Sequence, residues 1–222
     1  MGAFDGQIAL ITGASRGFGY AAAVALAAEG AEIIAVGRTS GALEELDDAI
    51  KAAGGRATLV PLDITDDAGL QRLCLSIFER WGGVNLWLHS AIHATPLAPT
   101  AHVSQNDMNK SIAVNITASQ RLITMVEPLL KAKDGVAIHL DDPCAGAKFF
   151  AAYGSTKAAQ KALFDGWAAE TVSIGPRVLS FTPEPMPTAT RARFYPGEDK
   201  AALSTPYAQA ARFVTWLKDK IQ

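Results

Sequence analysis

Short apolar runs alternate with longer amphipathic stretches along this chain of 222 residues. The apolar runs predict strands that are buried on both faces, and they cover residues 7–12, 31–37, 57–63, 84–90, 135–141 and 177–183. The stretches between them predict helices near residues 18–29, 41–53, 67–81, 104–132 and 151–173, and a further helical pattern follows residue 205.

This alternation predicts an α/β fold. Connections of helical length between buried strands are typical of a parallel, doubly wound sheet with helices on both faces. We expect six or seven strands in a single domain over residues 1–222, because the chain shows no linker, repeat or low-complexity tract. Ligands bind such sheets at the carboxyl ends of the strands.

Composition and charge narrow the functional classes. The net charge is −2 and the basic residues are scattered, so we expect no nucleic-acid partner. The chain has no apolar run that could span a bilayer and no signal-peptide core, which predicts a soluble, cytoplasmic protein. Cys74 and Cys144 are far apart and lack a CxxC partner, so we expect neither a disulfide nor a zinc site.

Two motifs suggest chemistry. The segment Ile11 to Gly19, ITGASRGFG, follows a predicted strand and opens a predicted helix. Its glycines allow a sharp turn and a close approach to a ligand, and the start of the helix favours an anion such as a phosphate, although such a turn also arises for backbone reasons alone.

The segment Tyr153 to Lys157, YGSTK, places a phenol and an ammonium on one helical face. That pair is either an acid–base couple or an exposed tyrosine beside a solvated lysine.

Together these motifs resemble the short-chain dehydrogenase/reductase family of Rossmann-fold, nicotinamide-dependent oxidoreductases. Thr12, Gly13, Gly17 and Gly19 match its TGxxxGxG turn, and Tyr153 with Lys157 match its YxxxK catalytic pair. The resemblance makes Tyr153, Lys157 and Asn115 catalytic, with Asn115 supporting the lysine, and it makes a small carbonyl compound or alcohol the substrate. The cofactor-binding residues that it implies are Gly13, Ser15, Arg16, Gly17, Phe18, Gly19, Arg38, Asp63, Ile64, Ser90, Ala91, Tyr153, Lys157, Pro183 and Thr188.

Charge at the end of the second predicted strand favours NADP(H) as the cofactor. NAD(H) remains the alternative. An NAD-type site places an acid at the end of this strand, whereas a 2′-phosphate needs a cation. Here the strand ends in Gly37-Arg38-Thr39, and Arg16 adds a second cation inside the glycine turn.

Three departures from the family pattern concern the active site. Ile92 stands where a glycine gives the cofactor room, and Glu184 replaces the glycine of a Pro-Gly turn. Asp142 aligns with the catalytic serine, and no serine lies between Lys133 and Tyr153. A protonated Asp142 would donate the hydrogen bond of the missing serine, an ionised one would repel the developing oxyanion, and a third interpretation makes Asp142 a turn residue before Pro143.

His89, His93 and His139 fall near the carboxyl edge of the predicted sheet. We expect them to line the substrate pocket or to be half-buried rather than to bind a metal, because no carboxylate or cysteine completes a ligand spacing. An apolar substrate body is predicted by Phe149, Met186, Phe194 and Tyr195.

Two functions remain open: an enzyme, or a dinucleotide-binding regulator that has lost efficient chemistry. The resemblance implies one subunit contact through the long helices at 104–132 and 151–173, whose Ala-rich faces suit close packing. It implies a second contact through a glycine-rich final strand, in whose place this sequence has a helical pattern. We therefore expect a homodimer rather than the family's common tetramer.

Overall fold

The computed structural model describes residues 2–221 and contains a six-stranded parallel sheet in the order β3-β2-β1-β4-β5-β6. The strands are β1 (Ile8–Thr12), β2 (Glu32–Gly37), β3 (Arg56–Pro61), β4 (Leu86–His89), β5 (Val136–Leu140) and β6 (Arg177–Phe181). The strand order reverses between β1 and β4, so the carboxyl ends of these two strands flank the point where such folds bind ligands. The predicted α/β class and doubly wound topology are confirmed.

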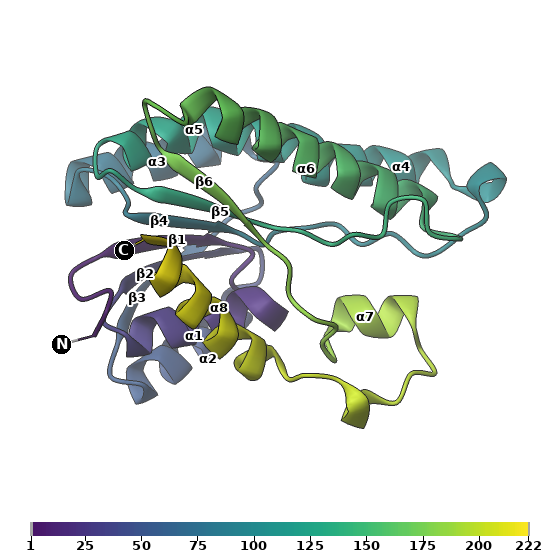
Figure 1. Ribbon diagram of the computed structural model, residues 1–222, viewed down its shortest axis with the longest axis horizontal. Coiled ribbons are helices and arrows are strands. Elements are labelled where there is room, and N and C mark those ends of the chain that lie inside the picture. Colours follow the sequence, from purple (N-terminus) through teal and green to yellow (C-terminus); the bar gives the residue numbers. More distant parts are fainter. Residues whose placement is uncertain (1, 222) are drawn as a thin grey trace.

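Helices cover both faces of the sheet (Figure 1). One layer contains α1 (Gly17–Ala28), α2 (Ser40–Ala52) and α8 (Pro206–Ile221), and the other contains α3 (Asp67–Trp81), α4 (Gln105–Ser111), α5 (Ser119–Lys131) and α6 (Ala151–Thr171). The short helix α7 (Ala189–Phe194) lies beyond the sheet on the side of the strands' carboxyl ends. Of the helices in residues 2–221, none combines the length and the apolar character needed to cross a bilayer.

Successive residues of the strands enter different cores, which explains their continuous apolar runs. On β2, Ile33 and Ala35 pack under α1 and α2, whereas Ile34 and Val36 pack under the opposite helix layer. Side chains alternate across a strand, so a strand covered on both faces needs apolar residues at every position. The two cores hold the sheet rigid beneath the cleft described below.

The predicted helix over 104–132 is three segments. Between α4 and α5 the chain forms the π-helical segment η2 (Ile112–Ala118), which carries the buried Asn115. Asn115 Oδ1 accepts from His93 N at 2.7 Å, and its Nδ2 donates to His93 O at 3.0 Å. The wider π-helical turn therefore carries a side chain that joins this helix to the loop after β4. Such turns are frequent at functional sites.

Candidate active site

A cleft of about 1120 Å³ opens at the carboxyl edge of the sheet. Its walls come from the glycine turn, from the segments after β2, β3, β4 and β5, and from the segment between β6 and α7. All of the cofactor-binding residues predicted from the sequence line it, namely Gly13, Ser15, Arg16, Gly17, Phe18, Gly19, Arg38, Asp63, Ile64, Ser90, Ala91, Tyr153, Lys157, Pro183 and Thr188. Positions spread over the chain therefore meet in one cavity.

The glycine turn leaves no room for side chains where it meets β4. A Cβ on Gly13 would lie 2.5 Å from Ala91 N, and one on Gly19 would lie 2.3 Å from Ser90 Oγ. Gly13 also has a φ of +87°, which glycine adopts without strain. The helix α1 that follows has neither a side-chain cap nor an acidic residue in its first turn. Its free N–H groups and positive dipole end thus fit the phosphates of a dinucleotide.

A cation and an acid meet at the end of the cleft beside β2. Arg38 Nη1 lies 3.8 Å from Asp63 Oδ2, and the Arg38 side chain is 58 % exposed. Asp63 also accepts from Thr65 N at 3.0 Å and from Thr65 Oγ1 at 2.8 Å. Burial raises the pKa of Asp63, but the Thr65 hydrogen bonds and Arg38 outweigh burial and lower it. The carboxylate is therefore ionised, and the exposed guanidinium beside it keeps donors free for a phosphate.

Tyr153 and Asp142 form a direct hydrogen bond. Tyr153, in the first turn of α6, donates from Oη to Asp142 Oδ2 at 2.8 Å. The main-chain oxygen of Asp142 accepts from Cys144 N at 2.8 Å, so the residue also takes part in the turn around Pro143. Burial raises the pKa of Tyr153, and Asp142 raises it further. The phenol therefore stays protonated at ordinary pH.

Lys157 lies one helical turn after Tyr153 and is buried at the floor of the cleft. Its Nζ donates to Leu140 O at 2.7 Å and to Gln160 Oε1 at 2.6 Å. Burial lowers the pKa of Lys157 to about 8, although Asp142 and Asp141 act in the opposite direction. Two of its three N–H groups thus have protein acceptors, and the lysine is predominantly an ammonium near neutral pH.

Asn115 is buried beside the cleft rather than in its wall. Besides its two bonds to the backbone of His93, it donates from Nδ2 to Thr156 Oγ1 at 3.0 Å. Thr156 precedes Lys157 on α6, so Asn115 joins η2, the loop after β4 and the helix that carries Tyr153 and Lys157. Its expected support of the lysine is indirect in this structure.

The expectation for two of the three histidines is wrong. His93 lines the cleft, but His89 and His139 are fully buried and contribute nothing to its wall. His89 is the last residue of β4 and His139 the last but one of β5, and their rings stack on Phe164 at centroid distances of 5.8 and 4.7 Å. Burial lowers the pKa of each imidazole to about 3, so both are neutral. Among residues 2–221 no group of three potential ligand side chains could hold a metal ion.

Aromatic side chains form one side of the cleft. Phe150, Tyr153 and Phe194 make a small buried cluster, with the rings of Tyr153 and Phe194 4.9 Å apart. Met186 and Tyr195 line the cleft as expected, whereas Phe149 does not and is 43 % exposed. Its neighbour Phe150 lines the cleft instead of Phe149. The sequence could not distinguish the two, because they are adjacent in a loop.

The other two departures from the family pattern are accommodated within the fold. Ile92 packs against the aromatic cluster of Phe150, Tyr153 and Phe194 and also lines the cleft. Glu184 accepts from Gln209 Nε2 at 3.1 Å, which ties the segment after β6 to α8. Both side chains thus have partners in the protein, although they stand beside the space for a cofactor.

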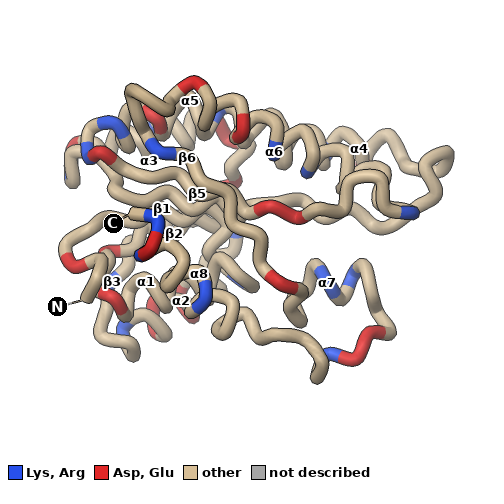
Figure 2. Tube along the Cα trace, viewed as in Figure 1, with Lys and Arg blue, Asp and Glu red and all other residues tan. Residues whose placement is uncertain are grey.

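Charges of both signs surround the opening of the cleft. Figure 2 shows acidic residues directly after β5 and basic residues on α7. Four of them line the cleft: Asp141, Asp142, Arg191 and Arg193. Arg191 is paired with Glu198 at 2.6 Å. Because acidic and basic side chains both stand at the opening, its charge has no single sign that would select a strongly charged substrate.

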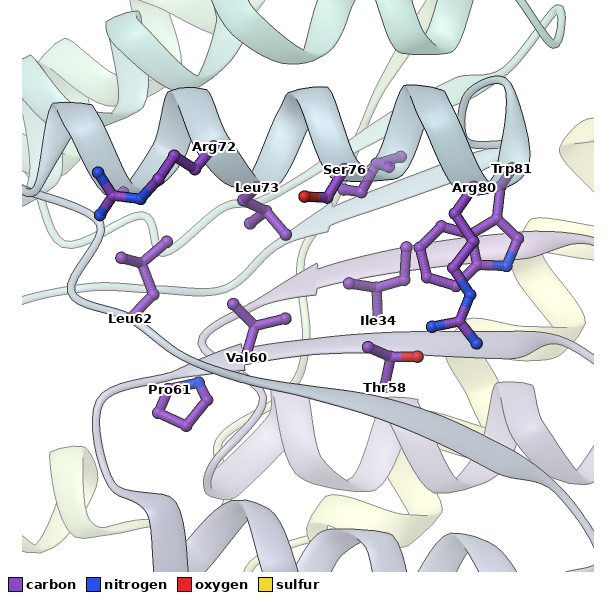
Figure 3. A pocket seen from close by; sticks show the side chains of 12 residues that line it. Ile34, Thr58, Val60, Pro61, Leu62, Arg72, Leu73, Ser76, Arg80 and Trp81 are labelled. Carbon is purple, nitrogen blue, oxygen red and sulfur yellow. The ribbon is translucent and has the colours of Figure 1, made fainter.

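A second, smaller hollow of about 340 Å³ lies between α3 and strands β2 and β3. Figure 3 shows Val60 between the strands and the helix, with Arg72 and Arg80 toward opposite ends of the hollow. Among the described residues that line it, none is a predicted site residue. The candidate chemistry is therefore confined to the large cleft.

Comparison with known proteins agrees with this geometry. Residues 7–199 match the family model described as short chain dehydrogenase. The chain is 32% identical over 171 residues to a fatty acyl-CoA reductase from Acinetobacter baylyi, which covers 75% of this chain and 58% of that protein. It is 32% identical over 197 residues to a 2,5-dichloro-2,5-cyclohexadiene-1,4-diol dehydrogenase from Sphingobium indicum, covering 86% of this chain and 77% of that protein.

Solved structures agree as well. A short chain dehydrogenase from Escherichia coli CFT073, complexed with NADPH, superposes with a TM-score of 0.89 at 26% identity, covering 97% of this chain and 91% of that chain. One from Pseudomonas syringae gives a TM-score of 0.87 at 30% identity, covering 92% and 85%. Fold and cleft thus define a Rossmann-type α/β protein. The chain belongs to the short chain dehydrogenase family.

Proposed function

We propose that residues 1–222 form one dinucleotide-binding and catalytic domain that reduces a ketone or aldehyde with NADPH, or oxidises the corresponding alcohol. The observation that carries this proposal is the position of Tyr153, whose hydroxyl lies 2.8 Å from Asp142 in the cleft while Lys157 forms the cleft floor. The uncapped start of α1 supports a dinucleotide in the same cleft.

A nicotinamide cofactor held in the cleft would supply a hydride for the carbonyl carbon. Tyr153 donates its hydroxyl proton to the substrate oxygen as that oxygen gains charge. Burial and Asp142 hold the pKa of Tyr153 above its ordinary value, so the group carries the proton that reduction uses, although it is a weaker acid than an ordinary phenol. Phenolate, which oxidation needs as the proton acceptor, is scarce at ordinary pH.

Asp142 occupies the place of the usual serine beside the phenol. In its acid form it donates a hydrogen bond to the substrate oxygen and stabilises the charge that develops there. As a carboxylate it accepts from Tyr153 at 2.8 Å, and it repels the same substrate oxygen. Its protonation state thus decides whether it assists or opposes the reaction.

Lys157 and Asn115 act on the cofactor side of the site. The third N–H of the Lys157 ammonium has no protein acceptor closer than 3.4 Å among the described residues, which leaves it for the ribose of the cofactor. Asn115 fixes the loop after β4 through the backbone of His93, and with it the wall formed by Ser90 and Ala91.

We propose NADP(H) as the cofactor, because Arg38 and Arg16 are the cations near the end of β2 that line the cleft. Two structural relatives at 26% identity are complexed with NADP or NADPH. NADPH should bind at least ten-fold more tightly than NADH, as about one charge-assisted hydrogen bond implies. Fluorescence titration of both cofactors measures this ratio, and Arg38→Asp should reverse it. Equal binding of the two cofactors to the unmodified protein would exclude the assignment.

A second function, a dinucleotide-binding regulator, is favoured by two observations. Tyr153 is hydrogen-bonded to a carboxylate, which opposes turnover, and Ile92 stands beside the cofactor space. A panel of aliphatic and aromatic ketones and aldehydes, assayed with NADPH, separates the two functions. Turnover of any of them supports the enzyme, whereas tight NADPH binding without turnover across the panel supports the regulator.

A further inference from the structure

A chain of buried hydrogen bonds runs from β4 to the catalytic lysine. His89 Nε2 lies 2.9 Å from Ser119 Oγ, and Gln160 Nε2 donates to the same oxygen at 2.8 Å. The other end of the Gln160 amide accepts from Lys157 Nζ at 2.6 Å. His89, Ser119, Gln160 and Lys157 are all buried. The functional residues predicted from the sequence include neither Ser119 nor Gln160.

Lys157 fixes the orientation of the Gln160 amide. An ammonium can only donate, so the carbonyl end of Gln160 faces Lys157 and the NH₂ end donates to Ser119 Oγ. Ser119 Oγ in turn donates to Asn115 O at 2.9 Å. His89 holds the far end of the chain, with its Nδ1 2.8 Å from Thr12 Oγ1.

The side-chain acceptor of the buried Lys157 ammonium is an uncharged amide. The imidazoles of His89 and His139 are neutral and bring no charge to the chain. His139 Nε2 lies 3.2 Å from Gln160 Oε1 and 3.4 Å from Lys157 Nζ, and His139 Nδ1 is buried without a partner among the described residues. Gln160 is thus the short side-chain contact that holds the ammonium, together with the main-chain oxygen of Leu140.

We propose that Gln160 is a positioning residue whose amide, oriented by Ser119, fixes the Lys157 ammonium at the floor of the cleft. The proposal rests on the proposed function in one respect only, namely that the third N–H of Lys157 serves a bound cofactor. Without the amide oxygen, Lys157 would keep the Leu140 carbonyl as its one close acceptor, and its Nζ would be free to turn about that bond.

The first measurement follows Lys157 without any cofactor. In protein labelled with ¹³C and ¹⁵N in lysine, the signal of Lys157 is identified by its loss in Lys157→Met. Gln160→Met removes the amide oxygen at similar volume and should lower the titration midpoint of Lys157 by about one pH unit, since a neutral acceptor favours the ammonium. Gln160→Glu keeps an acceptor in place and should raise the midpoint.

The other charged and titratable groups near Lys157 must be the same in all the variants that are compared. The charged and titratable side chains that face it among the described residues are Asp141, Asp142 and Cys144 from the segment after β5, His139 from β5 itself and His89 from β4. All of them remain in both variants. Gln120→Met is the matched control, because Gln120 is an exposed glutamine of α5 bonded only to Thr124 among the described side chains; it should leave Lys157 unchanged.

The second measurement is NADPH affinity. Gln160→Met should raise the Kd for NADPH about ten-fold, Gln160→Glu should restore it to near the wild-type value, and Gln120→Met should have no effect. Ser119→Ala should raise the Kd less than Gln160→Met does, and combining the two should add little, because Ser119 acts through the Gln160 amide.

The outcomes separate this proposal from the proposed function. If the wild-type protein does not bind NADPH, the proposed function fails, while the Lys157 titration still decides the role of Gln160. An unchanged midpoint in both Gln160 variants would mean that Gln160 only fills the core, and the proposal would be wrong. If Gln160→Met does not fold, the midpoint in Gln160→Glu alone decides: an upward shift supports the proposal, and none overturns it.

Discussion

Tyr153 is a buried phenol whose hydroxyl faces a carboxyl group. Replacing it by phenylalanine removes only the oxygen that carries the proton, so reduction of any accepted carbonyl compound should fall by about 100- to 10,000-fold. The fold should persist, because the ring remains packed on Phe194. Steady-state kinetics with NADPH and a thermal melt test both statements. Full activity in Tyr153→Phe would remove this residue from the mechanism.

Asp142 lies beside the Tyr153 hydroxyl that serves the same reaction. As a carboxylate it offers the substrate oxygen no hydrogen-bond donor and adds a negative charge where the transition state develops one. Asp142→Ser supplies a donor without the charge and should increase the reductive rate. Asp142→Asn supplies a donor of the original shape, and its rate should lie between those of the wild type and Asp142→Ser.

The three proteins are compared by their steady-state rates of reduction of one model ketone. The oxidation direction should remain slow in the unmodified protein, because the pKa of Tyr153 is raised by burial and by Asp142. Identical rates for the wild type, Asp142→Ser and Asp142→Asn would show that the carboxyl group has no part in the chemistry.

At the scale of elements, the ends of β4 and β5 carry the two buried imidazoles, His89 and His139. Each has a pKa of about 3 in the folded protein against 6.5 as its ordinary value. Between these values the unfolded chain binds more protons than the folded one, so stability rises with pH through this window and is lost as pH falls from 6.5 toward 3. The loss is on the order of 4 kcal/mol per imidazole at the acid end.

Urea unfolding at a series of pH values between 7 and 4 measures this slope. The double variant His89→Asn, His139→Asn has no imidazole to protonate at these positions and should show a flatter acid limb, whatever its stability at pH 7. A slope equal to that of the wild type would mean that other groups, such as paired carboxylates, dominate the acid limb.

The elements themselves were largely predictable. Strands such as β2 are covered on both faces, so their unbroken apolar runs could be recognised without knowing their neighbours. The π-helical segment η2 was not predictable, because hydrophobic spacing over 104–132 fits one regular helix and the wider turn is tied to bonds between Asn115 and His93.

Some residues of the candidate site could be predicted from the sequence and others could not. Residues fixed by local motifs, such as Gly13 and Tyr153, were found from the sequence and meet in the cleft. Gln160 was missed, although its place three residues after Lys157 puts both on one helical face. Its role depends on Ser119 and His89, which come from distant segments, so no local pattern could indicate it.

At the scale of the whole molecule, α4, η2, α5 and α6 form an outer layer (Figure 1) that we expect to meet a second copy. Ile112 of η2 is 40 % exposed in this layer. Light scattering should give the mass of a homodimer, and Ile112→Lys should shift it toward the monomer. Leu75→Lys, at a similarly exposed apolar residue on α3, should leave the mass unchanged. A stable tetramer at low concentration would contradict the expectation.

The π-helical segment η2 fixes how far α4 is rotated relative to α5. A helix turns about 100° per residue, so deleting one residue within Ile112–Ala118 would rotate the two helices against each other by that angle unless the wider turn absorbed the change. If it closed to a regular helix, α4 and Ser119 could keep their places, but Asn115 would turn away from the backbone of His93, which it holds in this structure. The chain should therefore tolerate substitutions at exposed positions such as Ala113 far better than the loss of one residue there. Length, rather than composition, is the constrained property of this segment.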